Sequence, residues 1–259
     1  NTADSVVTLP NADALVGAAT GNKVTVGGSK ALTIAGDLDA VQGLTIEKAA
    51  GAGTVTLKST DTLTDADFSK AAVDVLDVTV ATGKDLIVNE NTTLKFSTDN
   101  GTRIYNVDNA AGTLGAGLGV LKADFAAGQT SVTLGANVGV LSATANTANV
   151  TITTLTPDAQ TNTIVAAGSK NLTVNTFAAT GDEVFSASTM TGKLNIGATG
   201  ASSTIIGGLG NDTLSGGAGD DVLAGGVGDT TYVFGRGDGQ DTISSWDRNS
   251  NKRDVLRFK

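Results

Sequence analysis

Glycine and aspartate recur at fixed positions near one end of this 259-residue chain. Two consecutive nonapeptides, residues 207–215 and 216–224, fit the pattern G-G-x-G-x-D-x-U-x, in which U is a large aliphatic residue. Glycines allow positive φ and let backbone carbonyls approach an ion closely, and Asp212 and Asp221 add carboxylate oxygens. Ca²⁺ takes about six to eight oxygen ligands, so one turn cannot complete its coordination. The pattern therefore predicts stacked turns, in which each turn meets the turn about 18 residues further along the chain.

The expected calcium ligands are oxygen atoms of three successive repeats and of the segment that follows them. In the third repeat, residues 225–233, Thr230 stands where aspartate belongs, and Asp229 is the candidate substitute. Residues 198–206 keep the register but lack the double glycine and the aspartate, which indicates a coil without a metal site. The candidate metal residues are Gly208, Gly210, Asp212, Gly217, Gly219, Asp221, Gly226, Gly228, Asp229, Asp238 and Asp241.

The repeat region is strongly acidic. Between Gly207 and Asp241 the chain carries six aspartates and one arginine. Mutual repulsion among these carboxylates should keep the segment open until Ca²⁺ binds to the folded form. A disordered acidic linker is the alternative, but linkers do not keep a nine-residue register with Leu214 and Leu223 in phase.

This region resembles the RTX, or haemolysin-type calcium-binding, family. The resemblance covers about 55 residues, because the segment from Tyr232 to Phe258 looks like the one that closes the parallel β-roll in that family. It implies a secreted protein that folds when it meets extracellular calcium. Residues 1–200 share a looser similarity with the β-solenoid parts of RTX-type surface-layer proteins and adhesins.

The first 200 residues carry short apolar–polar–apolar triads, and the centres of the early ones lie 8, 12 and 11 residues apart. The later triads centred on Thr151, Thr173 and Asn195 lie 22 residues apart, with strands expected at Ile164 and Phe185 between them. This spacing predicts an all-β fold, a parallel β-solenoid over residues 1–200 that runs into a calcium-binding β-roll with a C-terminal cap over residues 201–259. An antiparallel sandwich is the competing architecture. Each nonapeptide points one aliphatic side chain inward, whereas each triad points two. We therefore expect one continuous stack whose interior narrows between about residues 197 and 207. Residues 64–72 and 121–127 have the composition of short helices.

Composition excludes several classes of function. The chain has no cysteine and no histidine, which removes ordinary zinc sites and Ser-His-Asp or Cys-His nucleophiles. A net charge of −9 argues against nucleic acid and anionic membranes as partners. No apolar run is long enough for a transmembrane helix, so we expect no membrane insertion. We expect no enzyme activity within these residues.

The favoured interpretation is a calcium-dependent structural module of a secreted bacterial cell-surface protein, most like a surface-layer subunit. Its partners would be calcium ions, further copies of itself in an array, and a cell-surface polysaccharide. The alternative is the C-terminal RTX roll of a secreted enzyme or a large adhesin whose active part lies outside this chain. The abrupt start and end of the sequence suggest a fragment of a longer protein.

Overall fold

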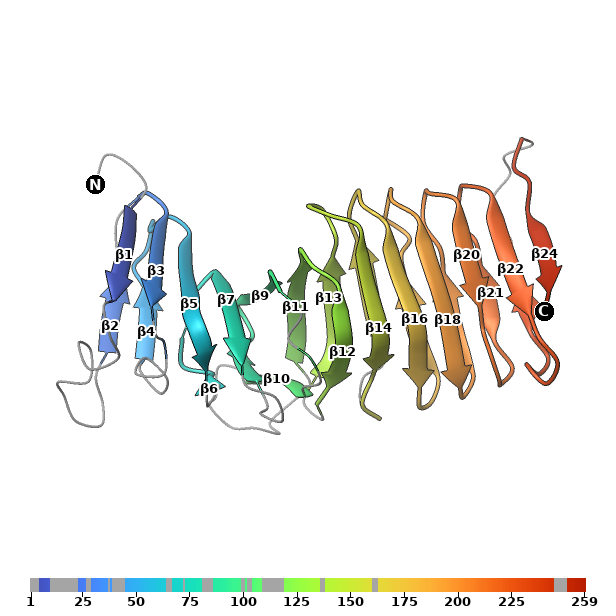
Figure 1. Cartoon of the computed structure of the whole chain (residues 1–259), viewed down its shortest axis with the longest axis horizontal. Helices are drawn as coiled ribbons and strands as arrows, with labels where there is room; N and C mark the ends of the chain where they lie inside the picture. Colours follow the sequence, from blue (N-terminus) through green and yellow to red (C-terminus); the bar gives the residue numbers. More distant parts are fainter. Residues whose placement is uncertain are drawn as a thin grey trace.

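The computed structural model describes residues 5–9, 23–26, 29–36, 38, 45–63, 67–71, 73–80, 86–98, 101, 104–108, 119–135, 138–159, 163–244 and 251–259. These residues form strands and turns and no helix. The strands stack into one elongated rod, with β1 near one end and β24 at the other (Figure 1).

Successive strands alternate between two long sheets, as expected when each coil of the chain contributes one strand to each side. The 12-stranded sheet contains, in order, β1 (Ser5–Leu9), β3 (Leu32–Gly36), β5 (Val55–Leu63), β7 (Val75–Val80), β9 (Thr93–Phe96), β11 (Gly119–Phe125), β13 (Val138–Thr144), β15 (Thr163–Ala167), β17 (Glu183–Ser186), β19 (Ser203–Ile206), β21 (Val222–Ala224) and β23 (Thr242–Ile243). The 10-stranded sheet contains β6 (Asp67–Phe68), β8 (Leu86–Asn89), β10 (Ile104–Asp108), β12 (Gln129–Leu134), β14 (Val150–Thr156), β16 (Leu172–Ala179), β18 (Leu194–Gly200), β20 (Asp212–Ser215), β22 (Thr230–Phe234) and β24 (Val255–Phe258). A small sheet pairs β2 (Lys23–Val26) with β4 (Thr45–Lys48).

Every strand pair among the described residues is parallel, which confirms the β-solenoid and rules out the antiparallel sandwich. Thr151 pairs with Thr173, and Thr173 pairs with Asn195, as their even spacing predicts. On the opposite sheet Ile164 pairs with Phe185. Parallel pairing requires a crossover between neighbours, and here the strand of the other sheet provides it.

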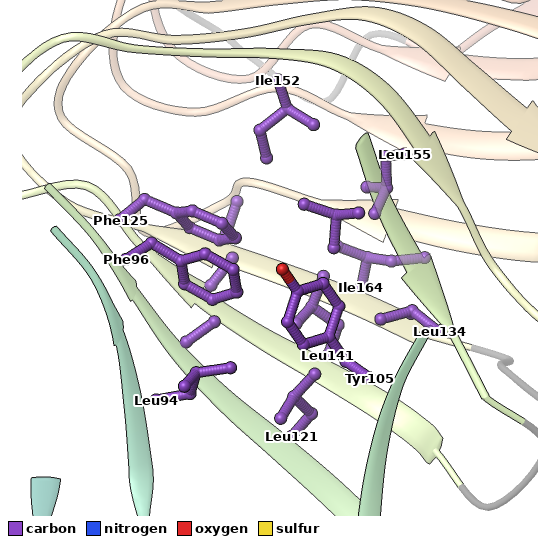
Figure 2. Packing of buried hydrophobic residues seen from close by; sticks show 14 of the residues in the cluster. Leu94, Phe96, Tyr105, Leu121, Phe125, Leu134, Leu141, Ile152, Leu155 and Ile164 are labelled. Carbon is purple, nitrogen blue, oxygen red and sulfur yellow. The ribbon is translucent and has the colours of Figure 1, made fainter. Parts of the chain in front are cut away.

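Columns of apolar side chains fill the space between the two sheets. In the coils of β9 to β11 this core is aromatic: Phe96 stacks on Phe125 with ring centroids 4.5 Å apart and meets the edge of Tyr105 at 5.2 Å (Figure 2). Leu121 and Leu141 lie beside these rings (Figure 2). Because each coil buries its own inward residues against the coils on both sides, the rod is held together by nearest-neighbour contacts along its length.

The same core continues into the C-terminal repeats. One inward column runs without a break through Phe185, Ile205 and Leu223, across the expected boundary at residue 200. β18 buries three apolar side chains, whereas β20 buries Leu214 as its one apolar side chain. The narrowing of the interior between residues 197 and 207 stays a prediction. The two sheets therefore pass through the expected boundary as one stack.

The predicted helices are wrong where the structure describes them. Residues 121–125 belong to β11, in which Leu121, Ala123 and Phe125 are buried and alternate with more exposed neighbours. Residues 67–68 form β6, and residues 64–66 lie outside the described part of the chain. Alanine-rich composition favoured a helix, but pairing with β9 and β13 buries the alternate side chains and overrides it. None of the described residues forms a helix that could cross a membrane.

Candidate calcium sites in the C-terminal turns

The three glycine-rich turns each lead into a short strand. Residues 207–211 precede β20, residues 216–220 precede β21, and residues 225–229 precede β22. Gly217 and Gly226, the second glycines of their repeats, have φ angles of 79° and 78°, a conformation that other residues rarely adopt. These two glycines are therefore needed to turn the chain tightly before β21 and β22.

Successive turns on the same side of the rod stack at the predicted interval. Leu214 pairs with Tyr232, and the backbone of Leu194 contacts the side chain of Asp212, in both cases across 18 residues. Ser203 contacts Asp221 across the same interval on the other side. Each side of the roll therefore carries its own row of turns.

Asp212 is buried inside this stack, with 2 % of its surface exposed. One carboxylate oxygen accepts a hydrogen bond from the Leu194 N–H at 2.7 Å, and the other accepts one from the Gly208 N–H at 2.6 Å. Burial raises the pKa of this carboxyl, although these two hydrogen bonds act in the opposite direction. Asp212 thus links its own turn to the coil before it.

Asp221 is buried as deeply, but only one of its two carboxylate oxygens accepts hydrogen bonds from the described residues. Its Oδ1 accepts hydrogen bonds from the Ser203 N–H at 2.7 Å and the Ser203 hydroxyl at 3.0 Å. Its Oδ2 is buried, and no donor among the described residues reaches it. Burial raises the pKa of Asp221, and the nearby Asp241 and Asp220 carboxylates raise it further. A buried carboxylate oxygen without a donor is an unfavourable arrangement that a bound cation would relieve.

The glycines also bring backbone carbonyls together. A Cβ on Gly226 would overlap the carbonyl oxygen of Gly208, and a Cβ on Gly228 would overlap that of Gly210. On the other side of the roll, a Cβ on Gly239 would overlap the carbonyl oxygen of Gly219. Only glycine allows the turns to approach so closely, and the approach leaves rows of oxygen atoms between them.

Carbonyl and carboxylate oxygens are the hard ligands that Ca²⁺ prefers, so the donor set of these turns fits calcium. The described residues contain no group of three acidic side chains close enough to hold a metal ion together. In the repeats that match fully, the ligands would be carbonyl oxygens of the turn glycines together with Asp212 and Asp221. The individual assignments remain predictions.

The remaining predicted aspartates lie in different surroundings. Asp241 Oδ1 accepts a hydrogen bond from the Asp221 N–H at 3.1 Å, and its pKa is raised by burial and then by Asp238 and Asp220. Asp238 Oδ2 accepts a hydrogen bond from the Gly235 N–H at 2.6 Å and so closes its own turn. The structure thus places Asp220, Asp221, Asp238 and Asp241 along one side of the roll.

Asp229 belongs to a different row, at the position just before the strand. Side-chain oxygens in this row accept hydrogen bonds from the backbone of the next coil. Asn171 Oδ1 accepts the Lys193 N–H at 3.0 Å, and Asn211 Oδ1 accepts the Asp229 N–H at 3.1 Å. The Asp229 carboxylate continues the row by accepting the Arg253 N–H at 2.9 Å. This contact is exposed, and the role of Asp229 as a metal ligand remains a prediction.

Sequence reasoning missed two residues that complete the third turn. Asp254 Oδ1 accepts a hydrogen bond from the Thr230 N–H at 3.0 Å, across 24 residues instead of 18. Lys252 Nζ donates to the carbonyl oxygen of Gly226 at 2.7 Å. A signal for Asp254 was present, because it is an aspartate directly before an aliphatic strand, as in the first two repeats. The irregular spacing concealed it.

Glu183, in the coil that precedes the repeats, was also missed. Its buried carboxylate accepts hydrogen bonds from the Thr180 N–H and hydroxyl and from the Gly181 N–H, at 2.7–3.1 Å. Burial alone would raise the pKa of Glu183, but these hydrogen bonds outweigh it and hold the pKa below its ordinary value. All these donors come from its own turn, so Glu183 is a structural acid that shapes that turn.

Comparison with known families agrees with this geometry. Residues 198–232 match the family model of the RTX calcium-binding nonapeptide repeat, which comprises four copies. The chain therefore carries RTX repeats, and its cofactor is Ca²⁺. No curated protein and no solved structure matches the chain. The matched segment includes residues 198–206, the coil that lacks the double glycine and the aspartate.

Proposed function

We propose that this chain, whose residues 198–232 carry RTX calcium-binding repeats, is a calcium-ordered rod of a bacterial surface layer in which copies pack side by side. The repeats and the β-solenoid fit a calcium-binding structural module of secreted proteins. Secretion of the unfolded chain by a type I system, with folding outside the cell, belongs to the same proposal. It assigns no catalytic step to these residues.

The observation that carries the proposal is the absence of exposed charge in the strands from β12 to β23; strands nearer the other end do carry charged side chains, such as Lys58 in β5 and Lys122 in β11. In β12 to β23, residues of the strands themselves include two charged side chains, Glu183 and Asp212, and both are buried. The outward positions hold β-branched, hydroxyl and small residues, such as Val165, Thr204 and Val222. The acidic residues of this region lie mainly in the turns at the edges of the faces.

Uncharged faces favour side-by-side packing, because no ionic group has to be desolvated when two rods meet. Charged turns at the edges would keep the rods from stacking in other orientations. Bound Ca²⁺ would supply positive charge among the acidic turns of residues 207–241. The long faces with their exposed hydroxyls would also suit contact with a cell-surface polysaccharide.

The test is to place a charge on a face and, as a control, at an edge. Val165 projects from β15 and is 37 % exposed, whereas Thr147 lies in an exposed turn. We expect Val165→Lys to abolish calcium-dependent sheets seen by electron microscopy without loss of folding, and Thr147→Lys to leave the sheets intact. Circular dichroism would verify that both variants fold.

Monodisperse rods from the unmodified chain in calcium would contradict the surface-layer role. That result would favour the alternative, in which the roll belongs to a secreted enzyme or a large adhesin. Sheets that form equally well from both variants would show that the uncharged faces are not the contact surfaces.

A further inference from the structure

The Lys252 ammonium lies within the turn region of the third repeat. Its side chain is only 7 % exposed, and Nζ donates to the Gly226 carbonyl oxygen at 2.7 Å. The carboxylate of Asp254 lies 3.3 Å from the same nitrogen. A lysine is rarely buried unless its charge is paired and its N–H groups have acceptors. Here Asp254 pairs with the charge and the Gly226 carbonyl oxygen accepts an N–H.

The third repeat also lacks the carboxylate that the first two repeats supply. Thr230 occupies the position that Asp212 and Asp221 hold in those repeats. Its hydroxyl donates a hydrogen bond to the carbonyl oxygen of Gly225 at 3.3 Å. The substitution therefore replaces a negative acceptor with a neutral donor and removes one anionic ligand from this turn.

Asp254 replaces part of what was lost. Its Oδ1 accepts the Thr230 N–H, the same kind of contact that Asp212 makes with Leu194 two coils earlier. Its Oδ2 faces the Lys252 ammonium. The two residues thus provide a carboxylate and a cation together, at the turn where a calcium-binding repeat would need a carboxylate and a metal ion.

We propose that the Lys252 ammonium is a tethered cation that takes the place of Ca²⁺ at the third repeat and ends the calcium row on that side of the roll. An ammonium carries positive charge and three N–H donors, so it satisfies carbonyl and carboxylate oxygens that would otherwise face a metal ion. The last turn is then ordered by the chain itself. This inference rests on the proposed calcium-dependent folding of the repeats.

The experiment compares calcium stoichiometry and local stability in the full chain. The double variant Thr230→Asp with Lys252→Met restores the repeat and removes the ammonium, and equilibrium dialysis should show one more bound Ca²⁺ than the unmodified chain. Lys252→Met alone should gain no calcium. In saturating calcium it should lower the thermal midpoint by about 3–10 °C, because the turn loses charge-assisted hydrogen bonds. Lys193→Met, at an exposed lysine before β18, is the matched control and should change neither value.

Three outcomes would count against these ideas, and they are distinguishable. An unmodified chain that binds no calcium overturns both the proposed function and this inference. A folded double variant with the same stoichiometry as the unmodified chain overturns the inference alone. The inference also fails if Lys252→Met leaves hydrogen exchange of residues 225–234 in calcium as slow as it is in the Lys193→Met control.

Discussion

Replacing Asp221 by asparagine should uncouple the roll from calcium without breaking the contact that aligns its turns. Oδ1 of the new side chain can still accept the Ser203 N–H and hydroxyl hydrogen bonds. The amide group then occupies the position of Oδ2, which is buried and has no donor within the described part of the native chain. The substitution therefore removes one charge and one predicted metal ligand while keeping shape and volume.

The size of the effect follows from binding linkage. Extracellular calcium modules have Kd values of about 10⁻⁴–10⁻³ M, so about 10 mM free calcium stabilises a folded site by about 1.4–2.7 kcal/mol. Losing one site should reduce calcium-dependent protection by a factor of about 10–100. In calcium-free buffer the variant should be at least as stable as the native protein, because an unpaired buried charge has been removed.

The assay is hydrogen exchange of peptides covering residues 203–224, measured in EGTA and in calcium, because it reports the local opening free energy of the roll. Asp212→Asn is the matched control. Both Asp212 oxygens accept backbone N–H groups, from Leu194 and Gly208, so an amide must turn an NH₂ toward one of these donors. We expect this variant, unlike Asp221→Asn, to lose about 1–3 kcal/mol already in EGTA, because a backbone N–H loses its acceptor. In calcium, the loss of a predicted ligand would add to this.

The reasoning would be refuted if Asp221→Asn kept the full calcium-dependent increase in protection. It would also be refuted if Asp221→Asn destabilised the calcium-free roll as much as Asp212→Asn does. The first result would mean that Asp221 is not a ligand. The second would mean that its Oδ2 is satisfied in solution.

Two further predictions address the turns. Gly226→Ala should reduce calcium-dependent protection of the roll severely, because it combines an unfavourable φ of 78° with a collision against the stacked turn. Gly237→Ala has a φ of 88° but open space around the new methyl group, so it should lower the free energy of unfolding in urea by only about 1–2 kcal/mol. Equal losses in the two variants would argue against close stacking. Glu183→Gln should lower the free energy of unfolding by about 1–3 kcal/mol at pH 7. Since the folded pKa of Glu183 is depressed below its ordinary value of 4.5, this contribution is present above that pH and is lost as pH falls through the folded pKa. Urea unfolding at pH 7 and pH 3 should therefore show the difference between native and variant shrinking at the lower pH, and a constant difference would contradict it.

Regular parts of the chain could be read from the sequence because their spacing repeats. The even interval of Thr151, Thr173 and Asn195 predicted which strands pair, and the nine-residue register predicted that Asp212 and Asp221 stack on coils 18 residues away. In a solenoid each residue meets its counterpart one coil away, so a constant interval in sequence becomes a contact in space.

Irregular parts could not be read in this way. Residues 121–125 have a helical composition, but strands on both sides of β11 supply pairing partners that the local sequence does not reveal. Lys252 and Asp254 were missed because the last coil is 24 residues long, which removes them from the repeat register. In both cases the structure was determined by pairing with strands or residues far away in the sequence.

Residue types and intervals alone were enough to indicate a parallel all-β stack and the oxygen-rich calcium turns, since glycine conformation, strand alternation and ligand chemistry are local properties. Folding in three dimensions determined which oxygen atoms accept hydrogen bonds. Asp212 accepts two backbone N–H groups, Asp221 has one oxygen with no donor from the described residues, and the third turn contains the Lys252 ammonium of the following coil. These differences depend on how neighbouring coils are placed against one another, and a nine-residue pattern carries no information about the coil that will lie on top of it.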